Sequence, residues 1–215
     1  MTRPPFIVLE GIEGSGKSTQ IRLLEDWLQQ VGVAHVLTRE PGGTPVGERI
    51  RETVLHGVDL SIPPETELLL ILAARAAFVQ EVVRPALERG MVVVSDRFSW
   101  STLAYQGYGR ELPLDQVTRM DAFATGGLVP DLYVLLDVSV GGGLERQGRA
   151  GMVADRFEGE GEAFLERVRG GYMALVAGED NAVRIDGTDD AETVQARIRA
   201  ALAGRFPETF SRGTV

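Results

Sequence analysis

A glycine-rich segment near the N-terminus constrains the fold more than any other feature. It lies between an apolar run, Phe6–Glu10, and a segment, Lys17–Val31, whose apolar residues recur at helical spacing. A strand, a Gly-x4-Gly-Lys-Ser turn and a helix in this order form a loop whose backbone N–H groups surround phosphate oxygens. The residues predicted to bind a nucleoside triphosphate are Gly11, Ile12, Glu13, Gly14, Ser15, Gly16, Lys17, Ser18 and Thr19.

The parts of this loop have distinct expected roles. The glycines let backbone N–H groups turn inward, and the following helix adds the positive end of its dipole. Lys17 is expected to reach the β- and γ-phosphates, and the Ser18 hydroxyl to coordinate Mg²⁺. Lys17 is also the only lysine in the chain. Codon bias explains that shortage simply, yet the one lysine stands where a flexible point charge is needed.

Short apolar runs alternate with helical patterns along the whole chain. The runs predict strands at Phe6–Glu10, His35–Thr38, Met91–Ser95, Leu132–Asp137 and Val183–Asp186. Helical spacing predicts helices at Lys17–Val31, Pro45–Leu55, Glu65–Arg89, Ser99–Tyr108, Leu114–Thr125 and Asp189–Leu202. This alternation predicts an α/β fold, a P-loop NTPase three-layer sandwich whose parallel β-sheet is covered by helices on both faces.

Local signals refine the helix ends. Thr44 is expected to cap the helix that starts at Pro45, and Pro85 to kink or split the long apolar helix. Asp189 and Glu192 have the spacing of a capping box.

The chain reads as a single domain, residues 1–215, without a repeat or linker. Glycines at Gly141–Gly143 and Gly148–Gly161 predict a mobile flap, which gives a short lid at about residues 146–161. The tail, Pro207–Val215, is expected to be loosely ordered.

Composition excludes several classes of protein. The net charge of −9 argues against binding to a nucleic-acid polymer, which needs a basic surface. The chain has no cysteine, so disulfides and thiolate metal sites are ruled out. The first residues show no long apolar stretch of the kind that a signal peptide has, and no apolar run approaches the roughly 20 residues that span a bilayer. We therefore expect a cytoplasmic protein with no membrane partner.

Three carboxylates, Glu10, Asp96 and Asp137, end predicted strands. Ligands of parallel sheets gather at the carboxyl ends of the strands. An acid at the end of an apolar run beside a phosphate loop is typical of a metal-holding residue. Asp96 is the preferred candidate, with Asp137 less favoured and a structural role open for each. Glu10 directly precedes the loop and could contact either the metal or an acceptor group. The expected metal site comprises Ser18, Asp96 and Glu10.

Arginines near predicted loops and helix ends are the expected catalytic groups. Phosphoryl transfer depends on positive groups that spread the charge of the transferred phosphoryl, a role that arginines fill. The candidates are Arg39, Arg75, Arg97, Arg110, Arg146, Arg149 and Arg156. Arg75 stands out because it interrupts an apolar helix among small residues, although a salt-bridged or snorkelling arginine would look the same.

Five segments together resemble the thymidylate kinase family. They are Gly11–Ser18, Thr38–Thr44 (Thr-Arg-Glu-Pro-Gly-Gly-Thr), Ala73–Arg75, Ser95–Phe98 (Ser-Asp-Arg-Phe) and Ser101–Gly107 (Ser-Thr-Leu-Ala-Tyr-Gln-Gly). They keep the order and spacing of the family, and the likeness runs from about Phe6 to Leu202. The resemblance implies that ATP and dTMP react, with Mg²⁺, to ADP and dTDP.

The resemblance also implies roles for the acceptor-site residues. Arg75 and Arg97 would clamp the dTMP phosphate, for which bidentate guanidinium contacts are suited. Thr102 and Gln106 would bond the thymine edge, and Tyr105 would lie near the sugar and exclude a ribose 2′-hydroxyl. Further acceptor-site residues implied are Glu10 near the sugar or metal, Pro41 against the base, Ile71, and Arg39 with Glu40 in support of the Pro41 loop.

Two positions depart from the family's usual pattern. Ile71 stands where the family usually has a phenylalanine that stacks on thymine, so the aromatic contact is lost. Glu13 stands where some members have an arginine. Members with such a loop carry the catalytic arginine in the lid, which closes over ATP and excludes water. The lid candidates here are Arg149 first, then Arg146 and Arg156.

The sequence also bears on other functions. A switch GTPase usually reads guanine with an Asn-Lys-x-Asp motif, which the sole lysine at position 17 excludes. A kinase for another nucleoside monophosphate or small metabolite stays open, as does a nucleotide-binding protein without turnover. The apolar second face of the Glu65–Arg89 helix predicts a homodimer, although burial within one chain would give the same pattern.

Overall fold

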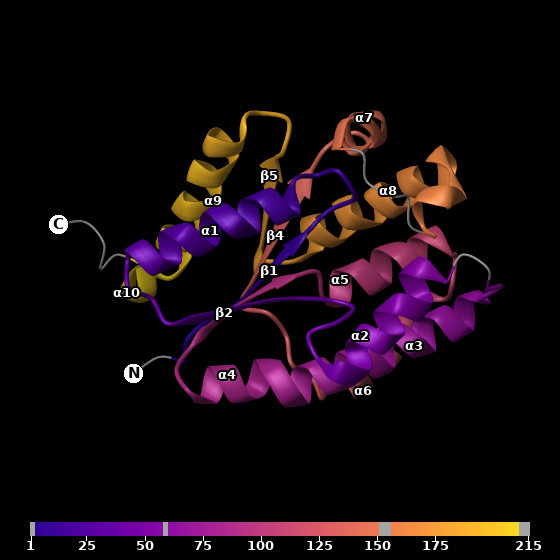
Figure 1. The fold of residues 1–215 in the computed structure, drawn as a ribbon, viewed down its shortest axis with the longest axis horizontal. Helices are drawn as coiled ribbons and strands as arrows, with labels where there is room; N and C mark the ends of the chain where they lie inside the picture. Colours follow the sequence, from indigo (N-terminus) through magenta and orange to yellow (C-terminus); the bar gives the residue numbers. More distant parts are fainter. Residues whose placement is uncertain (1–2, 58–59, 151–155, 211–215) are drawn as a thin grey trace.

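A five-stranded sheet lies at the centre of the molecule, as a computed structural model that describes residues 3–57, 60–150 and 156–210 shows (Figure 1). The strands are β1 (Phe6–Glu10), β2 (His35–Arg39), β3 (Val92–Asp96), β4 (Leu132–Asp137) and β5 (Ala182–Asp186). Their order across the sheet is β2-β3-β1-β4-β5, and every pairing is parallel. This confirms the predicted α/β fold.

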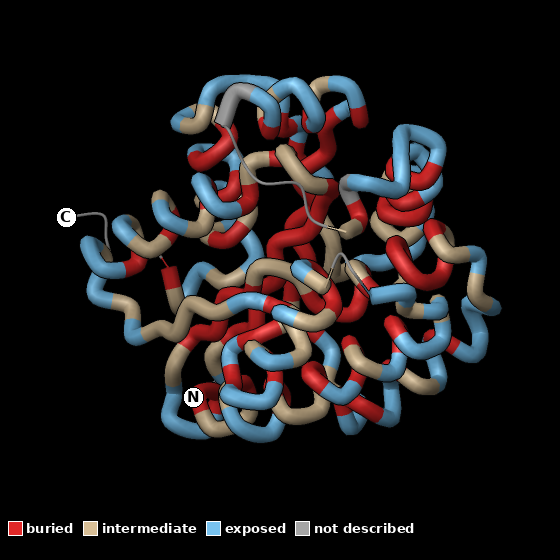
Figure 2. Tube along the Cα trace, turned by 45° about the vertical axis from the view of Figure 1, so that its right-hand side comes forward, coloured by how far each residue is buried: buried red, intermediate tan, exposed pale blue. Residues whose placement is uncertain are grey.

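Alternate residues of the central strand face two separate cores. Ile7 and Leu9 pack with α1 (Lys17–Gln30) and α9 (Ala191–Arg205) on one side. Phe6 and Val8 pack on the other side. The helices there are α3 (Pro64–Phe78), α4 (Arg84–Glu88), α5 (Ser99–Thr102) and α8 (Glu162–Gly178). Helices thus cover both faces, and the buried strands run through the middle of the molecule (Figures 1 and 2).

Two predicted helices contain wide π-helical turns. The Glu65–Arg89 prediction corresponds to α3, a π-helical turn at Val79–Val83 and α4. Pro85 was expected to kink or split this helix. It has no N–H to donate to the preceding turn and its ring crowds the carbonyl four residues back, and the interruption takes the form of the π-helical turn just before it. A second π-helical segment, Leu103–Gly109, continues α5.

Two further helices confirm their predicted signals. Helix α2 (Pro45–Arg51) runs into a π-helical turn at Glu52–His56, and Thr44 Oγ1 accepts a hydrogen bond of 3.0 Å from the Gly47 N–H. Helix α6 (Leu114–Thr125) has the predicted bounds.

Helices α7 (Val140–Ala150) and α8 were not predicted from the sequence. Gly141–Gly143, predicted to be part of a mobile flap, lies in α7. Helix α8 was not predicted, although Phe164, Val168 and Tyr172 recur at helical spacing and are buried. A short 3₁₀ turn, Glu158–Glu160, leads into α8.

The C-terminal segment also differs from its prediction. Pro207–Phe210 forms the helix α10, and the Phe210 ring stacks on Trp27 with 5.5 Å between centroids. Residues 207–210 are therefore ordered, while 211–215 lie outside the described residues. The cap of α9 is Asp190, not Asp189, because the Asp190 carboxylate accepts from the Thr193 N–H at 2.8 Å.

Among the described residues, no helix combines the length and the apolar character that crossing a membrane requires.

Candidate active site

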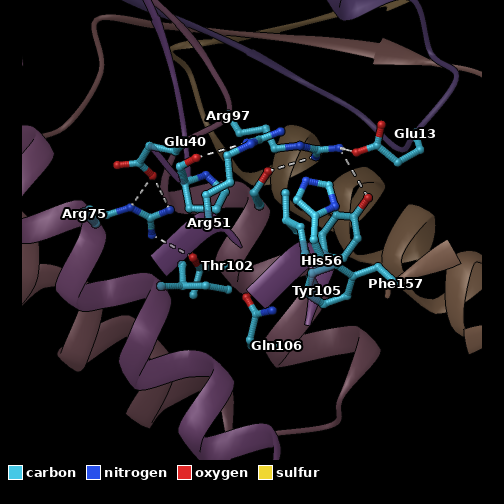
Figure 3. A pocket seen from close by; sticks show the side chains of 14 residues that line it. Glu13, Glu40, Arg51, His56, Arg75, Arg97, Thr102, Tyr105, Gln106 and Phe157 are labelled. Atoms are coloured by element: carbon cyan, nitrogen blue, oxygen red, sulfur yellow. Dashed lines mark hydrogen bonds and ion pairs between the residues drawn. The ribbon is translucent and has the colours of Figure 1, made fainter. Parts of the chain in front are cut away.

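Two hollows adjoin at the carboxyl edge of the sheet. The first, here the inner cavity, has a volume of about 180 Å³. Its walls are Glu13, Glu40, Pro41, Arg51, Leu55, His56, Ile71, Arg75, Arg97, Ser101, Thr102, Tyr105, Gln106 and Phe157 (Figure 3). The second, here the loop groove, has about 350 Å³ and lies over the glycine-rich loop. Its walls are Glu13, Gly14, Gly16, Lys17, Ser18, Thr19, Arg39, Glu40, Arg51, Asp96, Arg97, Arg146 and Gln147. Both hollows share the side chains of Glu13, Glu40, Arg51 and Arg97.

The glycine-rich loop has the predicted form of a phosphate cradle. It joins β1 to α1, and Gly16 precedes the helix with a left-handed φ of 98°. At Gly11, φ is 145° and a Cβ would lie 2.5 Å from the Leu136 carbonyl oxygen, so only glycine fits. Lys17 Nζ donates to the carbonyls of Gly11 and Ile12, both at 2.9 Å. Burial lowers the pKa of Lys17, whose ammonium is held inside the loop.

Arg97 follows β3 and has a backbone that L-residues rarely adopt, with φ at 74°. Two contacts hold this backbone: its N–H donates to the Leu9 carbonyl at 2.9 Å, and its carbonyl accepts from Ser95 Oγ at 2.8 Å. The guanidinium donates to the Gly11 carbonyl at 3.0 Å and pairs with the Glu13 carboxylate. Arg97 therefore joins the phosphate loop to the inner cavity.

Glu13 is one of two carboxylates, with Glu40, that line both hollows. Burial alone would raise its pKa, but Arg97 and Lys17 outweigh burial and lower the pKa to about 2. Glu13 is therefore an anion in the space between loop groove and inner cavity, where phosphate groups of a nucleotide would carry the same sign of charge.

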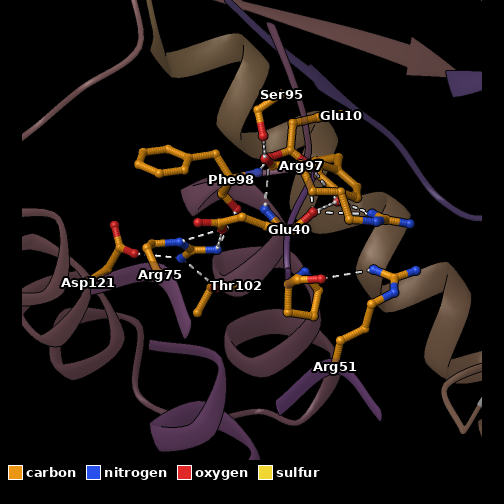
Figure 4. Close-up of polar contacts among 12 residues, drawn as sticks. Glu10, Glu40, Arg51, Arg75, Ser95, Arg97, Phe98, Thr102 and Asp121 are labelled. Carbon is orange, nitrogen blue, oxygen red and sulfur yellow. Dashed lines mark hydrogen bonds and ion pairs between the residues drawn. The ribbon is translucent and has the colours of Figure 1, made fainter. Parts of the chain in front are cut away.

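Arg75 lies at the opposite end of the inner cavity from Glu13 (Figure 3). Its side chain is 1% exposed. Nε donates to Glu40 at 2.7 Å, Nη1 donates to Thr102 Oγ1 at 2.7 Å and to Asp121 at 2.6 Å, and Nη2 donates to the Phe98 carbonyl at 3.0 Å (Figure 4). The sequence suggested a clamp on phosphate, but this guanidinium lies among buried partners away from the loop.

The carboxylates around Arg75 set the charge of this end. Burial raises the pKa of Glu40 to about 7. Burial would lower the pKa of Arg75, but Glu40 and Asp121 outweigh it and the pKa is raised. Asp121, on α6, carried no signal in the sequence because it meets Arg75 only through the packing of α3 against α6.

The predicted thymine-side residues lie along the inner cavity: Thr102 contacts Arg75 at one end, and the Tyr105 ring lies under Arg97 toward the Glu13 end (Figure 3). Thr102, Tyr105 and Gln106 line the inner cavity from the helix that starts at Ser99, and Pro41 and Ile71 line it from other elements. Thr102 and Gln106 are each 1% exposed, and Ile71 is 8% exposed. The inner cavity thus has apolar walls and a few buried polar groups, as small-molecule sites do.

Glu10 has a structural position that does not support its predicted metal role. It is 0% exposed. Oε1 accepts from the Phe98 N–H at 2.9 Å and the Ser101 N–H at 3.2 Å, while Oε2 accepts from Ser101 Oγ at 2.6 Å and the Tyr172 hydroxyl at 3.0 Å. Four donors occupy its carboxylate, which anchors the segment after β3 and lines neither hollow.

Asp137 is also engaged. It pairs with Arg169 at 2.9 Å and with Arg184 at 2.6 Å, so its carboxylate faces two arginines. This geometry argues for the structural role that the sequence left open.

Ser18 and Asp96 fit a magnesium ion. Both line the loop groove, and they also line the neighbouring groove beside β2. Asp96 Oδ1 is buried and has no hydrogen-bond partner among the described residues, which is unusual for a carboxylate oxygen. Carboxylate and hydroxyl oxygens are the ligands that Mg²⁺ prefers. This donor set therefore suits the ion better than one that includes Glu10.

The three lid arginines differ in position. Arg146 lines the loop groove and donates to the Gly187 carbonyl at 2.8 Å and the Thr188 carbonyl at 3.2 Å. Arg156 donates to the Val54 carbonyl at 3.0 Å and pairs with Glu67, so it lies on the side of the inner cavity. The side chain of Arg149 lies outside the described residues.

Arg39 lines the loop groove rather than the inner cavity, and it pairs with Glu48 at 3.1 Å. It shares the loop groove with Arg97 but does not line the inner cavity, so its predicted role in dTMP binding has no contact in that cavity to support it.

Arg51 and His56 line the inner cavity and were missed in the sequence. Arg51 faces both hollows, and its Nη1 donates to the Pro41 carbonyl at 3.0 Å. Its helix was predicted, but nothing in an arginine of an exposed helix indicated which face would meet the cavity.

Comparison with known proteins points to one family. The family model described as thymidylate kinase matches residues 9–198. A thymidylate kinase of Pelotomaculum thermopropionicum is 48% identical over 208 residues, 97% of this chain and 96% of that protein. One from Synechococcus is 50% identical over 210 residues (94% and 97%), and one from Alkalilimnicola ehrlichii is 45% identical over 212 residues (98% and 98%). With the phosphate loop and the adjoining cavity in place, the chain belongs to the thymidylate kinase family.

Proposed function

We propose that the loop groove holds the triphosphate of ATP while the inner cavity holds dTMP, so that the γ-phosphoryl passes directly between them. The chain catalyses the phosphorylation of dTMP to dTDP by ATP, as its family does. The observation that carries the arrangement is the sharing of Glu13, Glu40, Arg51 and Arg97 by both hollows. A donor in one and an acceptor in the other would meet at these side chains, and position is the main requirement of phosphoryl transfer.

Three cations surround the meeting point. Lys17 lies in the loop and would follow the β- and γ-phosphates once they replace the carbonyls that it now contacts. Arg97 would hold the acceptor phosphate, since its guanidinium lies beside the loop. Arg51 faces both hollows and would bridge donor and acceptor. Together they would spread the charge that develops during transfer.

The opposite end of the inner cavity suits the base. Ile71 and Pro41 give apolar contact, and Tyr105 would lie beside the sugar. Thr102 and Gln106 would contact the thymine edge. We assign Arg75 to this end rather than to the phosphate, because its guanidinium contacts Thr102 and Phe98 while Arg97 lies beside the loop.

Ser18 and Asp96 would hold Mg²⁺, and bound there the ion would neutralise phosphate charge. The buried, unpaired Asp96 Oδ1 supports this assignment. Residues 146–161 would form the lid, with Arg149 as the first candidate for the catalytic arginine. Arg146 would flank the nucleoside of ATP, since it contacts the 187–188 loop beside the groove. Because its donor is ATP, we place the enzyme in the cytoplasm.

A homodimer would cover the apolar surface of α3 and α6. Leu69 on α3 is 56% exposed and Phe123 on α6 is 90% exposed, and a groove between these helices is lined mainly by apolar side chains, with Glu65 and Gln116 at its walls. Exposed apolar surface of this kind is typical of an interface. Sedimentation of Leu69→Asp beside the unaltered protein tests it: a dimer should become monomeric.

The experiment for the reaction is an acceptor panel. Nucleoside monophosphates and small phosphorylated metabolites are offered with ATP and Mg²⁺, and ADP release is followed. We expect dTMP to give the highest kcat/KM. A higher value for another acceptor would support the alternative, a kinase for a different nucleotide or metabolite. Lys17→Ala should retain its fold by circular dichroism but lose at least 10³-fold in kcat, on the order of a missing phosphate-stabilising cation.

A further inference from the structure

A buried carboxylate, Glu67, contacts the amide that we assign to the thymine edge. Glu67 lies in the first turn of α3 and is 0% exposed. Its Oε1 accepts from Gln106 Nε2 at 2.8 Å and from Arg110 Nε at 3.2 Å. Its Oε2 accepts from Arg110 Nη2 at 3.1 Å and pairs with Arg156. We propose that Glu67 is a positioning residue that fixes the orientation of the Gln106 amide and thereby selects a pyrimidine that carries an N–H at position 3.

The argument starts from the two ends of an amide. The NH₂ end donates and the carbonyl end accepts, and the two are nearly equal in shape. A carboxylate paired with two guanidinium groups offers only acceptors, so the NH₂ end of Gln106 must face Glu67. The carbonyl end then faces the other way. The Gln106 Oε1 atom is buried, has no hydrogen-bond partner in the described part of the chain, and points into the inner cavity (Figure 3).

An acceptor at this position distinguishes the pyrimidines. Thymine and uracil carry N3–H, which can donate to Gln106 Oε1. Cytosine has an unprotonated N3, which would place a lone pair against the carbonyl oxygen. A buried polar group that meets the wrong partner remains unpaired, and sites of this kind discriminate strongly. Thr102 Oγ1 accepts a hydrogen bond from Arg75, so its own hydroxyl hydrogen is left to donate to O4 of the thymine, next to N3. The selection rests on the proposed binding of dTMP in the inner cavity.

The Glu67 carboxylate also links Gln106, the residue that we assign to the thymine edge, to the segment that leads into α8. Arg156 contacts Glu67 and the Val54 carbonyl, and Arg110 contacts Glu67 at one side and Glu160 at the other, at 2.6 Å. Gln106 is thus not held by its own helix alone. It is held through Glu67 by residues far apart in the sequence, and Glu160 offers a control that touches the network without touching Gln106.

The test compares Glu67→Gln with Glu160→Gln. An amide at position 67 can present its oxygen or its NH₂, which frees Gln106 to turn over. We expect Glu67→Gln to reduce the dTMP-to-dCMP ratio of kcat/KM at least tenfold, mainly through a higher KM for dTMP and a gain with dCMP. Glu160→Gln should leave the ratio within twofold. A folded Glu67→Gln enzyme with an unchanged ratio, or an equal loss in Glu160→Gln, would overturn the proposal.

If Glu67→Gln does not fold, the unaltered enzyme tests the orientation by NMR. With ¹³C,¹⁵N-glutamine labelling, dTMP should shift the Gln106 Cδ resonance and leave its slowly exchanging NH₂ signals in place. Large shifts of the NH₂ signals alone would refute the assigned orientation. Failure of the proposed function looks different: the unaltered enzyme would then prefer another acceptor in the panel, whatever the state of Gln106.

Discussion

Replacing Glu13 by glutamine should strengthen the binding of dTMP. The Glu13 carboxylate pairs with Arg97, the residue that we assign to the acceptor phosphate. The phosphate of dTMP must therefore compete with Glu13 for this guanidinium. Glu13→Gln keeps the size of the side chain and removes its charge, so Arg97 is released for the substrate.

The size of the effect follows from the pKa of Glu13. Lowering that pKa from 4.5 to about 2 corresponds to about 3 kcal/mol in favour of the charged form. The side chain is 29% exposed, and solvent screening reduces the usable part to about 1–2 kcal/mol. If most of this is released, dTMP should bind roughly 5 to 30 times more tightly in the absence of ATP.

Titration calorimetry measures the gain in dTMP affinity of Glu13→Gln, and urea unfolding measures its loss of folding stability. The low pKa of Glu13 adds stability that is present above pH 4.5 and fades as the pH falls toward 2. The variant should therefore be about 1–2 kcal/mol less stable at pH 7, with the difference shrinking below pH 4.5. Glu48→Gln is the control, because Glu48 pairs with Arg39 and not with Arg97. Equal dTMP affinity in both variants and the unaltered enzyme would refute the competition.

Three further outcomes follow from the geometry. Ile71→Phe should tighten dTMP binding by up to about fivefold through an aromatic contact worth ~1 kcal/mol. Weaker dTMP binding in calorimetry would refute the placement of Ile71 against the thymine base. Phe210→Ala should lower the free energy of unfolding by about 3 kcal/mol in urea, and no change would mean that α10 does not stabilise the fold. Burial raises the pKa of Glu40 to about 7, so its contribution to stability is complete below pH 4.5 and is lost as the pH rises through 7. Glu40→Gln should flatten this part of the pH–stability curve, and an unchanged slope between pH 5 and 8 would refute the assignment.

Local patterns predicted the parts of the fold that depend on neighbouring residues. The glycine-rich loop, the strand runs and the Thr44 cap are set within a few positions, so the sequence was sufficient. Helix α8 could have been found from Phe164, Val168 and Tyr172, but the glycines before it favoured a flap. Helix α10 depends on the contact of Phe210 with Trp27, which is far away in the sequence. Nothing in the local sequence of the tail indicates that contact.

In the candidate site, too, local features could be predicted from the sequence and contacts between distant segments could not. The sequence brought Arg97, Thr102 and Gln106 to one cavity correctly, because the stretch from β3 through the following helix is continuous. It could not show that Glu10 points at the N–H groups of residues 98 and 101, since an acid at a strand end looks the same whether it faces a metal or a loop. The partners of Arg75 come from three separate segments, and only the tertiary packing reveals them.

The backbone of Arg97 has a consequence for how the two substrates meet. A left-handed arginine costs about 1–2 kcal/mol and persists only when its surroundings fix it, as the contacts to Leu9 and Ser95 do here. Its peptide is therefore part of the rigid sheet edge rather than of a moving loop. During turnover the acceptor phosphate would stay at a stationary anchor. The movement that brings the reacting groups together would then come from the donor, ATP, and from the elements that bind it.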